Sequence, residues 1–156
     1  MATTKSGWKT VKKGVHSGEL VHMKETFTFG TGTTDAYGSE FGQGVTGAVF
    51  PPPGVDFTVM FIQNNTMSTA GDIVLYGAEA SGGTFALFKD DLIAYAAAAS
   101  AAGFATAARY SVGPGRTTPT GPESRAYKFL IDADGAHSAT TGSDKTAEIH
   151  VQFIQP

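Results

Sequence analysis

YKFLIDADG at residues 127–135 and KTAEIHVQFIQP at residues 145–156 carry the strongest strand pattern in the chain. In each run the large apolar side chains recur at every second residue, as on one face of a β-strand. A segment rich in Gly, Ser and Thr joins the runs, so we predict a β-hairpin here and expect the domain to end with it. This hairpin favours an all-β fold. Its expected inward face comprises Tyr127, Phe129, Ile131, Ile149, Val151 and Phe153.

Further strand patterns lie upstream of this pair. Residues 55–63 carry apolar side chains on both faces, so we expect a central strand there. Gly82 and Gly83 predict a tight turn between two more strands. We expect seven to nine strands, arranged as a two-sheet β-sandwich of jelly-roll type. The other expected strands are residues 8–15, 19–29, 72–77, 84–88 and 105–112.

Three segments interrupt the strand pattern. Residues 30–54 contain many glycines and then three consecutive prolines, which predicts a long structured loop suited to interactions. Residues 113–122, GPGRTTPTGP, predict a rigid turn-rich excursion. Residues 91–102 are rich in alanine and follow Asp90, which favours a short helix or helical turn. A loop of small residues at a subunit contact is the alternative for this segment.

The length of 156 residues fits one domain, but the charge is uneven along the chain. Five lysines against Glu19 give residues 1–24 a formal charge of +4, and the net charge of −3 leaves −7 for the remainder. We therefore divide the chain into a basic N-terminal arm with the first strand, residues 1–17, and a single sandwich domain, residues 18–156. The arm suits an acidic partner, although lysines also protect exposed strand edges from pairing. Trp8 is the one aromatic residue within the arm, so we expect no nucleic-acid partner.

The chain contains no cysteine, so it has neither disulfides nor thiolate chemistry. The polar, lysine-bearing start lacks an apolar stretch, so we expect synthesis in the cytoplasm and no membrane partner.

Motifs for metal or cofactor chemistry are weak. GQGVTG at residues 42–47 matches a dinucleotide-binding pattern in letters, but prolines follow where a helix would have to start. DADG at residues 132–135 resembles the start of a calcium loop, yet hairpin-turn chemistry explains it better. Of the four histidines, strand placement brings together at most His22 and His150, too few ligands for zinc. We predict no metal and no cofactor.

Catalysis is also not indicated, because no serine lies in a GxSxG elbow and no carboxylate pair stands out. We therefore expect no catalytic residues and a protein that is not an enzyme. Three aromatic residues, Trp8, Tyr37 and Phe41, fall outside the strand pattern and are candidate interface anchors or sugar-stacking platforms. The candidate interface residues are Lys5, Trp8, Lys9, Lys12, Lys13, Tyr37, Phe41 and Arg116.

Three stretches, SGWKTVKKG, FALFKDDLIAY and the closing YKFLIDADG with KTAEIHVQFIQP, resemble small virion structural proteins of tailed phages. The class resembled is the capsid decoration or cement proteins. The resemblance implies a jelly-roll fold, assembly as a homotrimer, and a place on the capsid surface of the virion, clamping neighbouring subunits of the major capsid protein. It transfers no site residues.

Two other functions remain open at this point. A carbohydrate-binding or receptor-binding module uses the same sandwich with Trp or Tyr platforms. A tail or head-completion protein is a third virion component with a similar sequence character.

Overall fold

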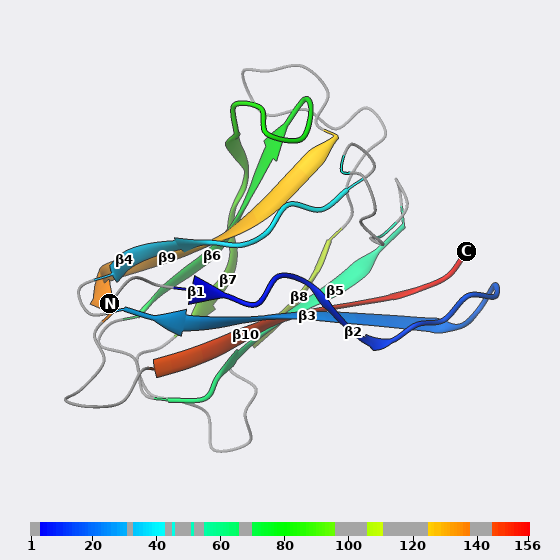
Figure 1. Cartoon of the computed structure of the whole chain (residues 1–156), viewed down its shortest axis with the longest axis horizontal. Coiled ribbons are helices and arrows are strands. Elements are labelled where there is room, and N and C mark those ends of the chain that lie inside the picture. The colour runs from blue at the N-terminus through cyan, green and yellow to red at the C-terminus, as the bar shows by residue number, and fades with distance from the viewer. Residues whose placement is uncertain are drawn as a thin grey trace.

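The computed structural model describes residues 4–30, 33–42, 45, 51, 55–65, 70–95, 106–110, 125–137 and 145–156. These residues form two antiparallel sheets and contain no helix, which confirms the predicted all-β sandwich (Figure 1). Sheet A comprises β1 (Thr4–Lys5), β2 (Lys9–Lys12), β3 (Leu20–Phe29), β5 (Phe57–Gln63), β8 (Thr106–Tyr110) and β10 (Lys145–Ile154). Sheet B comprises β4 (Thr33–Tyr37), β6 (Gly71–Ala78), β7 (Ala86–Tyr95) and β9 (Ala126–His137).

The last eight strands pair in a nested order. β3 pairs with β10, β4 with β9, β5 with β8, and β6 with β7, always antiparallel. Sheet A therefore runs β3-β10-β5-β8 and sheet B runs β4-β9-β6-β7. Successive strands from β3 to β6 alternate between the two sheets, so most connections cross from one layer to the other.

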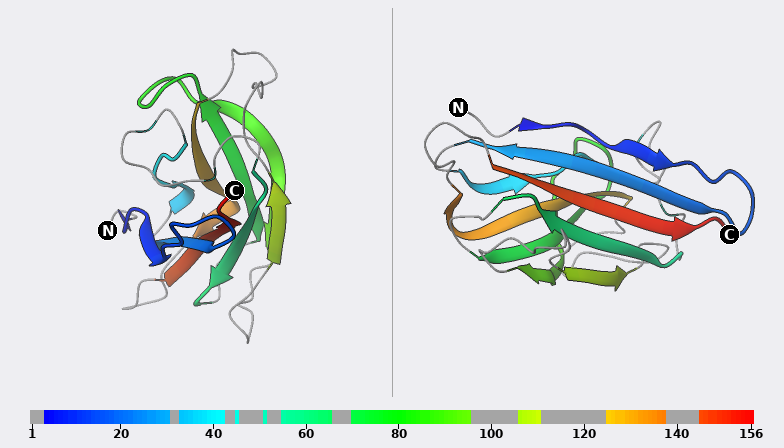
Figure 2. Two further views of the ribbon diagram at one scale, coloured as in Figure 1. Left: turned by 90° about the vertical axis from the view of Figure 1, so that its right-hand side faces the viewer. Right: turned by 90° about the horizontal axis from the view of Figure 1, so that it is seen from below.

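Strict alternation in sequence produces the longest pairing in sheet A. Residues 20–29 alternate between partly exposed and buried positions, and all ten have a partner on β10. The two strands lie side by side along the length of the molecule (Figure 2). β10 is itself enclosed, because β5 pairs with its other edge. As predicted from its two apolar faces, β5 is an interior strand, between β10 and β8.

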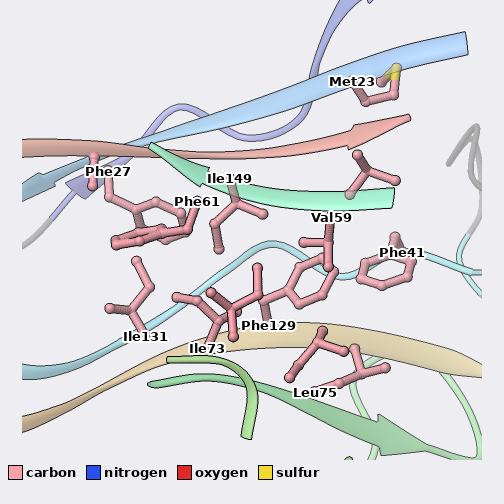
Figure 3. Close-up of a cluster of buried hydrophobic side chains, with 14 of the residues drawn as sticks. Met23, Phe27, Phe41, Val59, Phe61, Ile73, Leu75, Phe129, Ile131 and Ile149 are labelled. Carbon is pink, nitrogen blue, oxygen red and sulfur yellow. The ribbon is translucent and has the colours of Figure 1, made fainter. Parts of the chain in front are cut away.

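The core lies between the sheets and is dominated by aromatic and β-branched side chains (Figure 3). Phe27, Phe61 and Ile149 enter it from sheet A, and Phe129 and Ile73 enter it from sheet B. Phe41 stacks on Phe129, with ring centroids 5.1 Å apart. Each such side chain contributes about 1.5–3 kcal/mol by leaving water, so this layer holds the two sheets together.

The predicted terminal hairpin is wrong, although its inward face is confirmed. β9 belongs to sheet B and β10 belongs to sheet A, so the two strands face each other across the core. All six residues of the expected inward face are buried. An alternating pattern determines which side of a strand is buried, but two facing strands bury the same side chains as two paired ones.

Three local predictions also require correction. Residues 91–95 of the expected alanine-rich helix continue β7, where Ile93 pairs with Ile73 of β6; residues 96–102 lie outside the described part of the chain. DADG lies within β9 instead of forming a turn. The expected loop of residues 30–54 includes β4, because Ala36 and Tyr37 pair with β9.

The N-terminal residues add two short strands along β3. β1 pairs with residues 27–28 and β2 with residues 22–24, on the edge of β3 opposite to β10. A register shift follows Thr10 in β2. The arm is therefore part of sheet A over these residues, and it runs beside β3 in Figure 2.

Candidate functional site

The lysines of the arm fall into two groups. Lys9, Lys12 and Lys13 are exposed, and their ammonium groups make no hydrogen bond or ion pair with the described residues. Lys5 is different, because its Nζ donates hydrogen bonds of 3.2 Å to the carbonyl oxygens of Tyr37 and Gly38. Lys5 therefore ties the arm to the end of β4, and the other three lysines face solvent.

Two of the three candidate aromatic residues belong to the interior. Trp8 is half-buried, packs edge-on against Phe41 and Phe129, and donates from Nε1 to the carbonyl oxygen of Ser39 at 3.1 Å. Phe41 is fully buried, so its prediction as a surface anchor is wrong. The cause is a two-way backbone bridge with Tyr127, at 2.8 and 2.7 Å, which holds Phe41 over the core.

Tyr37 is the exposed aromatic candidate, with 45% of its surface accessible. Its ring meets Tyr76 edge-on at 5.9 Å. Lys128 Nζ lies 4.6 Å from the Tyr37 ring centroid and 4.2 Å from that of Phe85. Such cation–π contacts position both rings and the lysine on the outer side of sheet B. Arg116 lies outside the described residues.

The outer side of sheet A carries a surface of polar and charged side chains. Odd-numbered residues of β3 and β10 point inward and fill the core. The even-numbered residues, which alternate with them along each strand, therefore point outward. The register places His150 opposite Lys24 and Gln152 opposite His22. β2 extends the same rows by placing Lys9 opposite Lys24 and Lys12 opposite His22. The surface, here called the basic face, comprises Lys9, Lys12, His22, Lys24, Glu148, His150 and Gln152.

A continuous hydrogen-bond chain crosses the basic face. Gln152 Nε2 lies 3.3 Å from His22 Nδ1, His22 Nε2 lies 2.7 Å from His150 Nδ1, and His150 Nε2 lies 3.0 Å from Glu148 Oε1. With both histidines neutral, one arrangement satisfies every contact: each residue donates to the next, and Glu148 accepts at the end. This arrangement assigns the Nε2–H tautomer to both imidazoles.

The groups around His22 disfavour a positive charge on its ring, and those around Glu148 favour a negative charge on its carboxyl group. Burial, followed by the neighbouring charges of His150 and Lys24, lowers the pKa of His22 below its ordinary value of 6.5. Burial alone would raise the pKa of Glu148. Hydrogen bonds from Asn64 and His150, with the charges of His150 and Lys24, outweigh burial and lower that pKa. At neutral pH, therefore, His22 is neutral and Glu148 is ionised.

The basic face carries excess positive charge. Its three lysines are opposed by one carboxylate, Glu148, whose Oε1 lies 3.7 Å from Lys24 Nζ. Lys9 and Lys24 stand directly opposite each other on paired strands, and like charges in that position destabilise a sheet. This arrangement suits attraction of an anionic surface more than it suits stability.

Among the described residues, no group of three or more His, Asp or Glu side chains is arranged to hold a metal ion. The side chains of His22 and His150 do come together, as their strand positions suggested. They form a hydrogen bond in which His22 Nε2 lies 2.7 Å from His150 Nδ1.

Sequence reasoning assigned no interface role to Lys24 or Glu148. The signal for them was present, because each occupies an outward position on a strand whose inward positions were identified correctly. Sequence alone did not show that β3 and β10 are neighbours, so these residues could not be joined into one surface.

Sequence reasoning also assigned no role to Glu25. It occupies an inward position of β3 among Met23 and Phe27, and it is fully buried. Its carboxylate accepts hydrogen bonds from the Ser39 backbone N–H at 2.8 Å and the Ser39 hydroxyl at 2.5 Å. Gly38 permits this approach, since a Cβ there would lie 2.9 Å from Glu25 Oε1. Glu25 thus anchors the segment after β4, the same segment that binds Trp8.

In the part of the chain that the structure describes, no helix is long and apolar enough to span a membrane. The chain matches no protein-family model, no curated protein and no solved structure.

Proposed function

We propose that this protein is a virion structural protein that decorates a phage capsid and stabilises the shell by binding the major capsid protein. The observation that carries the proposal is the basic face, displayed on the rigid outer side of a two-sheet sandwich. Such a scaffold presents charge in a defined geometry without a flexible tether. Binding to the assembled shell, and less to free subunits, would stabilise that shell by linkage.

The strand pairing supports this proposal. Nested antiparallel pairs arise when one long hairpin is wrapped into two sheets, which is the layout of a jelly roll, a fold common in viral capsid proteins. We infer that the sandwich is of jelly-roll type. A fold hosts many functions, so the basic face, and not the topology, identifies the binding surface.

In the proposed mechanism, Lys9, Lys12 and Lys13 meet an acidic rim on the capsid, and residues 30–54 and 113–122 complete the contact between capsid subunits. Tyr37 belongs to the first of these segments and remains accessible. The virion surface is the proposed location.

Co-sedimentation with expanded capsids that lack the protein tests this function. The wild-type protein is expected to sediment with the capsids, and the triple substitution Lys9→Gln, Lys12→Gln and Lys13→Gln is expected to reduce binding at least tenfold, since interfacial charges of this kind steer association. Lys89→Gln, on β7 of the other sheet, is the matched single-charge control. Full binding by the triple variant, or no binding by the wild type, would refute the mechanism.

We also propose that the protein assembles as a homotrimer. Sedimentation equilibrium should then give a mass of three times the 16.2 kDa chain. Ring-shaped hexamers or dodecamers would instead favour a tail or head-completion protein.

One observation favours a carbohydrate-binding module as the second candidate. Tyr37 is exposed beside Tyr76, and aromatic rings of this kind stack on sugars. Glycan-array binding that is lost in Tyr37→Ala but kept in Lys9→Gln would select this function over capsid decoration.

A further inference from the structure

The hydrogen-bond chain on the basic face can accept one proton without losing a contact. If His150 gains a proton at Nδ1, that N–H donates to His22 Nε2, and the His22 proton moves to Nδ1. The Gln152 side chain then turns so that its amide oxygen accepts from His22. Every distance in the chain stays compatible with a hydrogen bond, and only the direction of donation between these three residues reverses.

A second proton has no such solution. It would place an N–H on each of the two facing nitrogens, which lie 2.7 Å apart. Both would then be donors and both rings cations, so the contact would break. The hydrogen-bond chain can therefore accept one added proton, and whether one histidine ring is protonated depends on the other.

The groups around the pair determine when that proton binds. Lys24 lies next to His22 on β3, and Lys9 and Lys12 lie across from β3 on β2. On β10, Glu148 is the one acidic neighbour of the pair. The facing residues of β5 are Met60 and Thr58, which carry no charge. The added proton is thus opposed by the nearby Lys24 ammonium group and favoured by the Glu148 carboxylate, and Lys9 and Lys12 add further positive charge to the same face.

An anionic partner would reverse this balance. Carboxylates placed over the basic face would offset the repulsion among Lys9, Lys12 and Lys24 and would favour the charged form of the histidine pair. Binding and protonation would then strengthen each other by linkage.

We propose that the basic face docks an acidic protein surface and that docking is coupled to uptake of one proton by the His22–His150 pair. This inference rests on the proposed function in that it describes the chemistry of the same binding face. An acidic protein fits better than nucleic acid, because the basic face also carries the Glu148 carboxylate beside Lys24, and this carboxylate would repel a continuous phosphate backbone.

The direct test is calorimetric binding of the intact protein to a short poly-L-glutamate probe at about pH 6.5 and low salt, near the ordinary histidine pKa. Titrations in MES and in Bis-Tris, which both buffer at this pH, differ in enthalpy by the number of protons taken up times the difference in buffer ionisation enthalpy. The expected uptake is about one proton, and affinity should rise up to about tenfold for each unit by which pH is lowered in this range.

Two variants, each with a control, locate the effect. Lys24→Gln should weaken poly-L-glutamate binding severalfold, whereas the matched control Lys89→Gln should not. The double substitution His22→Gln and His150→Gln should abolish proton uptake, whereas His16→Gln, at an exposed position in the N-terminal arm, should leave it unchanged. Equal uptake by wild type and the double variant would overturn the proposal.

A measurement on the unaltered protein covers the case in which the double variant does not fold. Long-range ¹⁵N–¹H spectra of the histidine rings report which nitrogen carries each proton. Both rings should be Nε2–H tautomers at about pH 8. At about pH 6.5, adding poly-L-glutamate should protonate the pair. Rings that do not respond to the probe would overturn the proposal.

Three further outcomes are informative, and the last two separate this inference from the proposed function. Tighter binding of duplex DNA than of poly-L-glutamate at equal salt would contradict an acidic protein partner. Capsid binding without pH dependence would refute the proton-linked docking and leave capsid decoration intact. Proton-linked binding of poly-L-glutamate without capsid binding would support the docking chemistry and refute capsid decoration.

Discussion

At the scale of single residues, Glu25 is the most consequential polar side chain in the core. Its buried carboxylate accepts two hydrogen bonds from Ser39, which lies in the segment that also binds Trp8. Glu25→Ala should leave the Ser39 N–H and hydroxyl without their acceptor and lower the free energy of unfolding by about 2–4 kcal/mol. Urea denaturation followed by circular dichroism measures the loss.

Glu40 provides a matched control for this prediction. Its carboxylate also accepts from a backbone N–H, that of Gly82, but the contact is exposed. Glu40→Ala should therefore cost less than about 1 kcal/mol. Equal losses in the two variants would mean that Glu25 does not anchor the segment.

His22 makes stability depend on pH. Because the pKa of His22 is lowered on folding, the unfolded chain binds more protons than the folded one between the lowered value and 6.5. This contribution is complete above pH 6.5 and is lost as pH falls through the folded pKa. The lowered pKa of Glu148 has the same sign, with its contribution complete above 4.5.

We therefore expect the urea midpoint to fall as pH is lowered from about 7.5 to about 5.5, across the range in which histidine titrates. The fall should be smaller in His22→Gln than in wild type, and His16→Gln should match wild type. An identical pH profile in His22→Gln and wild type would exclude His22 as the source.

At the scale of strands, the pairing of β3 with β10 joins the two halves of the basic face. Thr28 and Thr146 are directly opposite partners on these strands, and the chain has no cysteine to interfere. The double substitution Thr28→Cys and Thr146→Cys should form an intramolecular disulfide on mild oxidation, because directly paired residues fall within about 4.4–6.8 Å between Cα atoms.

The matched control for the disulfide pairs Thr28→Cys with Lys128→Cys, since residue 128 lies on β9 in the opposite sheet. Mass spectrometry after alkylation distinguishes bridged from free thiols. A bridge in the control and none in the paired variant would contradict the assigned sheet order.

These strands also show how far sequence reasoning reached. Alternation identified the buried faces of β3, β5, β9 and β10, because apolar side chains at every second residue have one favourable side. It did not identify the neighbours. β9 and β10 are consecutive and bury the same kind of face, yet they lie in different sheets, and this choice depends on long-range pairing that a local pattern does not record.

Tertiary context also overrode local propensity. Residues 91–95 favour a helix by composition, but β6 offers backbone partners and a buried position for Ile93. Phe41 sits in a glycine-rich polar segment, and its backbone bridge to Tyr127 places it in the core. The candidate lysines Lys9 and Lys12 were identified from charge alone, while Lys24, Glu148 and the histidine pair joined them only through the register of β2, β3 and β10.

At the scale of the whole molecule, the side chains that hold the sandwich together are separate from those on its candidate binding surfaces. The aromatic core holds the sheets together, the basic face covers the outer side of sheet A, and Tyr37 marks the outer side of sheet B. The proposed role in capsid decoration requires such a division, because the protein would contact a shell on one side while its own fold stays unchanged.

The most direct test of this account is electron microscopy of capsids that lack the protein, imaged before and after it is added. The account predicts new density on the outer capsid surface at the contacts between major capsid subunits, with sheet A toward the shell. Density confined to the tail or to a single vertex, or no added density, would contradict it.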